Sequence, residues 1–151
     1  AYLFDEKYEE LSATLDPRAD ALETLFFLTH ELFDMIERRV DIGLLTRMYS
    51  TQLTQDGEKQ LLDRSRLYYR LLRTIITRGQ ERGEITTERS ASQLVRLYAM
   101  CERGLITDWC LYRGDFSLTE YSDSALPLLL AGLRPGKKAE GETSSTAGKK
   151  D

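Results

Sequence analysis

The stretch GQERGEITTERSAS, Gly79 to Ser92, decides the fold because it separates two long segments with helical periodicity. Gly83 stands where the C-terminus of a helix favours a left-handed residue. Arg78 and Arg82 lie in the turns before it, where basic side chains favour the negative end of a helix dipole. The pattern therefore predicts that one helix ends at this corner.

The second half of the corner predicts the start of the next helix. Thr86 or Thr87 is suited to cap free backbone N–H groups, and Glu88 places an acidic side chain at the positive end of the new helix. A phosphate-binding loop is the alternative, but it would need glycine-rich backbone after a strand, and no strand pattern precedes Gly79. We therefore expect this stretch to connect two helices and to bind nothing. Gly79 itself lies inside the helical pattern, which suggests close packing against a neighbour.

The rest of the chain repeats the same pattern of apolar residues at spacings of three and four. We expect Asp16 to cap the second helix, with Pro17 at its first position, and Asp56-Gly57 to form a turn. The fold class is predicted to be all-α, an antiparallel helical bundle of about six helices. The expected helices span residues 1–15, 17–39, 41–55, 58–82, 88–112 and 118–133.

Length and charge limit the function. The 151 residues fit one domain, and the net charge of −4 argues against a surface that grips nucleic acid. The arginines at positions 64, 66, 70, 73 and 78 suggest a surface that binds nucleic acid. The solvated faces of long helices commonly carry a similar series of basic residues, so this pattern is not specific. No apolar run approaches the roughly 20 residues of a membrane span, and no signal peptide is evident, so we expect a cytoplasmic protein without membrane contact. Residues 134–151, rich in Gly, Ser, Thr and Lys, are predicted to be a disordered tail.

Catalytic and metal-binding patterns are weak. His30 is the single histidine, and it belongs to no metal-binding pair. Glu31 and Asp34 share a helix face, as carboxylates on a highly charged helix often do by chance. Cys101 and Cys110 lie nine residues apart and are expected to be buried thiols. The sequence thus predicts no catalytic residue, no metal and no cofactor.

Large apolar and aromatic residues suggest a cavity for a small molecule, with threonine, glutamine and tyrosine groups fixing its orientation. Met100 belongs to the same group of possible lining residues. A packed core without a ligand is the alternative interpretation of these residues. The candidate ligand-binding residues are Phe26, Thr29, Phe33, Met48, Tyr49, Gln52, Tyr68, Leu72, Tyr98 and Cys101.

The last two predicted helices are unusually apolar. In the segment 88–112 the apolar arc covers more than half of the circumference and leaves a narrow polar strip at Arg96, Arg103 and Thr107. The final segment, LTEYSDSALPLLLAGL, follows a capping-box sequence that starts at Ser117 and contains Pro127, which predicts a kink. So wide an apolar arc predicts that helix 88–112 is covered on two sides.

RGQERGEI, LVRLYAMCERGLITDWCLYRGDFSLTEY and ALPLLLAGL, in this order, resemble the C-terminal domain of TetR-type transcriptional regulators. The resemblance covers about residues 17–133. It implies a domain that binds a small, largely apolar effector and controls operator DNA through an N-terminal helix-turn-helix domain. We find no room for that domain before Tyr2, so residues 1–15 are interpreted as the remnant of a connecting helix, and residues 16–133 as the effector-binding and dimerisation domain.

The resemblance also implies a homodimer formed by the last two helices, most often in a repressor. A helical interaction module without a ligand remains an alternative, and an enzyme on a helical scaffold is a further one. The residues expected in the dimer interface are Gly104, Ile106, Trp109, Leu126, Leu129, Leu130 and Leu133.

Overall fold

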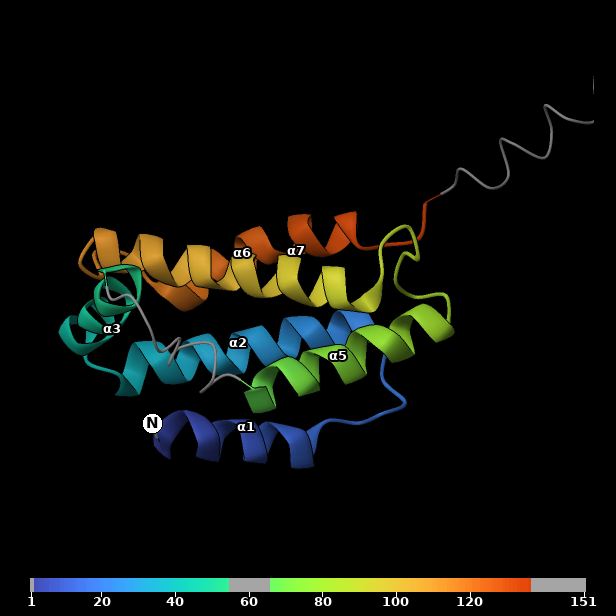
Figure 1. Ribbon diagram of the computed structural model, residues 1–151, viewed down its shortest axis with the longest axis horizontal. Coiled ribbons are helices and arrows are strands. Elements are labelled where there is room, and N and C mark those ends of the chain that lie inside the picture. The colour runs from blue at the N-terminus through green and yellow to red at the C-terminus, as the bar shows by residue number, and fades with distance from the viewer. Residues whose placement is uncertain (1, 55–65, 137–151) are drawn as a thin grey trace, which may run out of the picture.

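The computed structural model describes residues 2–54 and 66–136. Within these ranges the chain forms six α-helices and no strand, so the predicted all-α fold class is confirmed. The helices, labelled as in Figure 1, are α1 (Tyr2–Thr14), α2 (Ala21–Arg39), α3 (Ile42–Thr54), α5 (Arg66–Glu81), α6 (Ala91–Leu111) and α7 (Leu118–Gly132).

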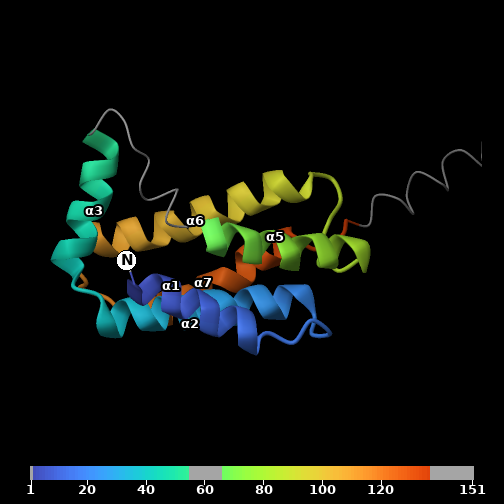
Figure 2. The same ribbon diagram turned by 60° about the horizontal axis from the view of Figure 1, so that its bottom comes forward.

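The helices are arranged in layers around α2 and α5, which pack against each other. Figure 1 shows α6 and α7 on one side of this pair and α1 on the other. Helix α7 packs mainly on α2, and α6 mainly on α5, with neighbouring long helices running in opposite directions. Figure 2 shows α3 standing across one end of the bundle, where it contacts α6. No helix in the described part of the chain is long and apolar enough to cross a membrane.

The corner after α5 ends that helix as the sequence predicts. Gly83 adopts a φ of +72°, and its N–H donates to the Gln80 carbonyl at 3.2 Å. The next N–H, of Glu84, donates to the Gly79 carbonyl at 2.8 Å. These two bonds define a Schellman motif, which satisfies carbonyls that the end of the helix leaves free. Ile85 then turns back into the core, where it is 1% exposed.

The predicted start of α2 was wrong by four residues. Asp16 and Pro17 form a turn, in which the Arg18 N–H donates to the Asp16 carboxylate at 2.9 Å. The helix is capped instead by Asp20, whose carboxylate accepts the N–H groups of residues 22 and 23, each at 3.1 Å. Both aspartates have the chemistry of a cap, and tertiary contacts select the second one. One such contact is the N–H of Ala21, which donates to Glu84 in the corner at 3.2 Å.

The predicted start of α6 was also wrong. Ser90 caps this helix through a capping box with Gln93, in which each side chain accepts the backbone N–H of the other. Thr86 lies in the preceding loop, where its N–H donates to the Leu133 carbonyl at 2.8 Å. The threonine thus ties the corner to the end of α7 and does not begin a helix.

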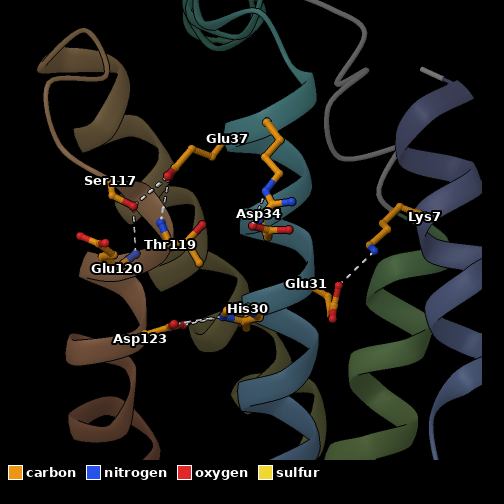
Figure 3. Close-up of polar contacts among 10 residues, drawn as sticks. Lys7, His30, Glu31, Asp34, Glu37, Ser117, Thr119, Glu120 and Asp123 are labelled. Atoms are coloured by element: carbon orange, nitrogen blue, oxygen red, sulfur yellow. Dashed lines mark hydrogen bonds and ion pairs between the residues drawn. The ribbon is translucent and has the colours of Figure 1, made fainter.

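Helix α7 is held on α2 by polar contacts at its N-terminal half (Figure 3). The Glu37 carboxylate accepts a hydrogen bond from the Ser117 hydroxyl at 2.8 Å and from the Thr119 N–H at 3.1 Å. One turn of helix further along, His30 Nδ1 lies 2.8 Å from an Asp123 carboxylate oxygen. These contacts fix the register of α7 on α2, while Leu126 and Leu130 bury its apolar side.

Several predictions concern residues outside the described ranges. These are the turn at Asp56-Gly57, the first part of the helix expected over 58–82, and the tail beyond residue 136. From Arg66 to Glu81 the expected helix is present as α5.

Gly79 has a packing role that a substitution can test. A Cβ atom at this position would lie 2.6 Å from Ile85 Cδ1 and 2.7 Å from the Ala21 Cβ, closer than real Cβ contacts come. We expect Gly79→Ala to lower the free energy of unfolding by about 1 kcal/mol or more, because overpacking outweighs the roughly 1 kcal/mol gained in helix propensity. Gly132→Ala is the control, because a Cβ at Gly132 meets nothing within 4 Å. Urea unfolding measures both variants, and equal stability changes would contradict the packing argument.

Candidate functional site

Four polar side chains meet inside the apolar core, between α2, α5 and α6. Thr29 comes from α2, Tyr68 from α5, and Tyr98 and Glu102 from α6. All four side chains are buried, and Glu102 is only 3% exposed. We call these residues the buried polar cluster. An acidic group in such a place needs hydrogen-bond partners, because burial of an unpaired charge is costly.

Hydrogen bonds connect the whole cluster. The Tyr68 hydroxyl donates to the Glu102 carboxylate, at 2.6 Å from one oxygen and 2.5 Å from the other. Thr29 Oγ1 lies 3.0 Å from Glu102 Oε2 and also hydrogen-bonds with the Tyr98 hydroxyl. The Tyr98 hydroxyl in turn donates to the Leu25 carbonyl at 3.0 Å. Three helices are thus linked through a single carboxyl group.

A count of protons indicates which form of Glu102 suits this arrangement. The cluster contains four links: Tyr68–Glu102, Glu102–Thr29, Thr29–Tyr98 and Tyr98–Leu25. If Glu102 is ionised, the three hydroxyl groups supply only three protons for these links. If Glu102 is protonated, its proton goes to Thr29, the threonine donates to Tyr98, and every link carries one proton. The neutral carboxyl therefore satisfies the cluster better than the carboxylate does.

The pKa of Glu102 agrees with this count. Loss of solvation by burial raises the pKa from 4.5 to about 7, although hydrogen bonds from Tyr68 and Thr29 and the charge of Arg103 act in the opposite direction. Burial, and then the charge of Glu102, also raise the pKa of Tyr68 and of Tyr98. The tyrosines stay protonated as donors, and Glu102 is the member of the cluster that titrates near neutral pH.

Helix α1 touches this cluster directly. The ring of Tyr8 stacks on the ring of Tyr68, with 5.0 Å between centroids and 27° between planes. Tyr8 and Leu11 are both buried, so α1 contributes to the core. Lys7 adds a contact between its Nζ and the Glu31 carboxylate of α2 at 3.3 Å (Figure 3). The position of α1 is therefore coupled to the hydroxyl group that donates to Glu102.

The structure brings together only part of the predicted ligand-binding set. Thr29, Tyr68 and Tyr98 meet in the cluster, and Phe33 and Leu72 are fully buried in the same core. Phe26 instead stacks on His30, at 6.5 Å between ring centroids. Met48, Tyr49 and Gln52 are half-buried on α3, and Cys101 is half-buried on α6.

Glu102 was missed by the sequence prediction, although a signal was present. Measured from Leu94 at 100° per residue, Glu102 lies at about 80°, between Tyr98 at about 40° and Val95 at about 100°. An acidic residue in the middle of an apolar arc is expected to be buried and hydrogen-bonded. The polar strip expected on this helix did not include it.

Comparison with known proteins gives the family. Residues 18–133 match the family model described as "Tetracyclin repressor-like, C-terminal domain". The chain belongs to this family, and the predicted resemblance is confirmed. Domains of this family are regulatory and generally not enzymes. No curated protein and no solved structure matches the chain.

The buried carboxyl group makes the stability depend on pH. Between about pH 4.5 and pH 7 the folded state binds more protons than the unfolded state, so the free energy of unfolding falls as the pH rises. Glu102→Gln stays neutral and lacks this fall. We therefore expect the free energy of unfolding of the variant, relative to that of the wild type, to rise by up to about 3 kcal/mol from pH 5 to pH 8. Urea unfolding across this range measures the difference, and parallel pH profiles of the two proteins would contradict it.

Proposed function

We propose that this chain is the regulatory domain of a TetR-like transcriptional regulator, which homodimerises and binds a small, largely apolar effector in the cytoplasm. In the intact regulator, which we take to be a repressor, the domain controls operator binding by a helix-turn-helix domain. The observation that carries this proposal is the contact between Tyr8 of α1 and Tyr68 of the buried polar cluster. It supports a route from the core to the helix that leads toward the DNA-binding domain.

The chemistry of the cluster supports an effector that is apolar over most of its surface. Phe33, Leu72 and Ile76 are fully buried apolar side chains of the same core. The Tyr68 and Thr29 hydroxyl groups are already oriented by their hydrogen bonds with Glu102. An effector with one hydroxyl or carbonyl group can form a hydrogen bond with this cluster in place of the one that it displaces, whereas a purely ionic effector would have to lose its solvation.

Binding there provides a mechanism of control. An effector that takes the place of the Tyr68 hydroxyl at Glu102 moves the Tyr68 ring, and Tyr8 is stacked on that ring. Helix α1 then has two arrangements, and the effector favours one only if it binds the two with different affinities. A change in α1 alters the separation of two DNA-binding heads in a dimer.

The surface of α6 and α7 supports the dimer. Leu97 and Met100 of α6, and Tyr121 and Leu128 of α7, are large apolar side chains that are exposed in the single chain, with Leu128 at 80%. Gly104 lies on the same side of α6, and open space surrounds its backbone. An apolar face of this kind favours a self-complementary contact between two copies.

The side chains proposed for this interface differ from those expected from the sequence. Five of the expected residues are buried within the single chain, so they pack in its core and do not reach a partner: Ile106, Trp109, Leu126, Leu130 and Leu133. Trp109, for example, donates its indole N–H to the Phe116 carbonyl at 2.9 Å. Gly104 is exposed and Leu129 is half-buried, so these two positions remain in the proposed interface.

The dimer can be tested with one charge. We expect Leu128→Glu to convert a dimer into a monomer at tens of micromolar, because the carboxylate loses its solvation in an apolar contact. Leu53→Glu is the control: Leu53 is 86% exposed but lies on α3. Sedimentation equilibrium measures the mass, and a wild-type chain that is already monomeric would contradict the proposal.

The effector site can be tested with neutral lipophilic compounds. We expect some of them to raise the melting temperature of the wild type in proportion to the logarithm of their concentration, as binding to the folded state requires. Thr29→Val should weaken the shift, because the hydroxyl group that contacts Glu102 and Tyr98 is lost. Thr24→Val is the matched control on the same helix, because the Thr24 hydroxyl donates to the Asp20 carbonyl and, among the described residues, to no member of the buried polar cluster. If no compound shifts the wild type, a helical interaction module without a ligand is favoured.

A further inference from the structure

A groove of about 510 Å³ lies between α5 and α6, outside the buried polar cluster. Four arginines line it: Arg70 and Arg73 from α5, and Arg96 and Arg103 from α6. None of the lining residues is acidic. The volume is within the range of roughly 300–1,000 Å³ that is usual for small-molecule sites.

These guanidinium groups form no close ion pairs within residues 2–54 and 66–136. In the described part of the chain, none of the four lies within ion-pair distance of a carboxylate. Arg103 donates to the Tyr69 hydroxyl, which directs its side chain toward the groove wall. Glu102, the preceding residue of α6, is buried in the core and accepts a hydrogen bond from Tyr68. Four like charges therefore line one groove, and an anion bound there would relieve their mutual repulsion.

A second groove shows that this arrangement is not general to the arginine-rich surface of α5. That groove, of about 350 Å³, lies between α5 and the segment after α1. Arg70 lines this groove too, together with Arg78, Arg82 and the acidic residue Asp16, and Arg82 Nη1 lies 3.9 Å from a Glu84 carboxylate oxygen. Its positive charge is therefore partly balanced by the protein itself.

We propose that the groove between α5 and α6 binds a small organic polyanion that carries two or more phosphate or carboxylate groups. Guanidinium groups pair with both kinds of oxyanion through two parallel hydrogen bonds. Val95 and the Tyr69 ring provide an apolar wall for the carbon part of such a molecule. This site is separate from the apolar effector site proposed above, and neither its existence nor its test depends on that site or on the dimer.

Calorimetric titration with two probes, sodium tripolyphosphate and citrate, tests the proposal on the full chain at one ionic strength. We expect at least one of them to bind, and the comparison separates a phosphate ligand from a carboxylate ligand. Arg73→Gln and Arg96→Gln should each weaken binding about tenfold, since a charge-assisted hydrogen bond is lost in each case. Both arginines are exposed, so these variants are expected to fold, and unfolding curves check this.

Two further variants test whether binding depends on the paired hydrogen bonds of Arg96 and on the groove itself. Arg96→Lys keeps the charge but loses the paired hydrogen bonds, so it should bind more weakly than the wild type and more tightly than Arg96→Gln. Arg47→Gln removes an exposed arginine from α3, outside the groove, and should leave affinity unchanged. The proposal is overturned if neither probe binds, or if Arg47→Gln weakens binding as much as Arg73→Gln does. It is also overturned if a DNA duplex binds in an Arg73-dependent manner while both probes do not.

Discussion

The buried carboxyl group of Glu102 is the constraint on which the rest of this core depends. Its oxygens accept or share hydrogen bonds with hydroxyl groups from α2 and α5, while Glu102 itself is carried by α6. Removal of a partner would leave a polar atom unpaired in an apolar environment, at a cost of about 1–3 kcal/mol. The three helices are therefore fixed in one rotational setting, which apolar contacts alone would specify less tightly.

The corner after α5 allows this setting to form. Gly79 lets Ile85 and Ala21 approach the α5 backbone closely, so the chain can turn back over its own helix and join α2 to the corner. The Glu84 carboxylate then accepts the Ala21 N–H, close to where the Asp20 cap begins α2. A local turn motif thus sets the relative position of two helices that also meet at the buried polar cluster.

Local patterns predicted the helices well, because apolar spacing and the Gly83 corner depend on residues close together in the sequence. The starts of α2 and α6 were predicted wrongly, since Asp16 and Asp20, or Thr86 and Ser90, are all chemically able to cap a helix. Contacts from distant segments select among them. Periodicity identified Thr29, Tyr68 and Tyr98 as core-facing. It did not identify Glu102, which bonds to Thr29 and Tyr68, because this acidic residue was assigned neither to the apolar arc nor to the polar strip of its helix. Ile106 and Trp109 were expected in the dimer interface but are buried within the single chain. Their burial depends on which helix covers each side of α6, and periodicity does not specify this.

Two adjacent residues of α6 connect the core with the arginine groove. Glu102 faces the buried polar cluster, and Arg103 lines the groove; the positive charge of Arg103 is one of the influences that lower the Glu102 pKa. An anion that pairs with Arg103 screens this charge, so it favours the protonated form of Glu102. By thermodynamic reciprocity, protonation of Glu102 must then favour the anion to the same degree. Because the protonated carboxyl also satisfies all four links of the cluster, an anion bound in the proposed groove would favour the same hydrogen-bonded arrangement of α2, α5 and α6.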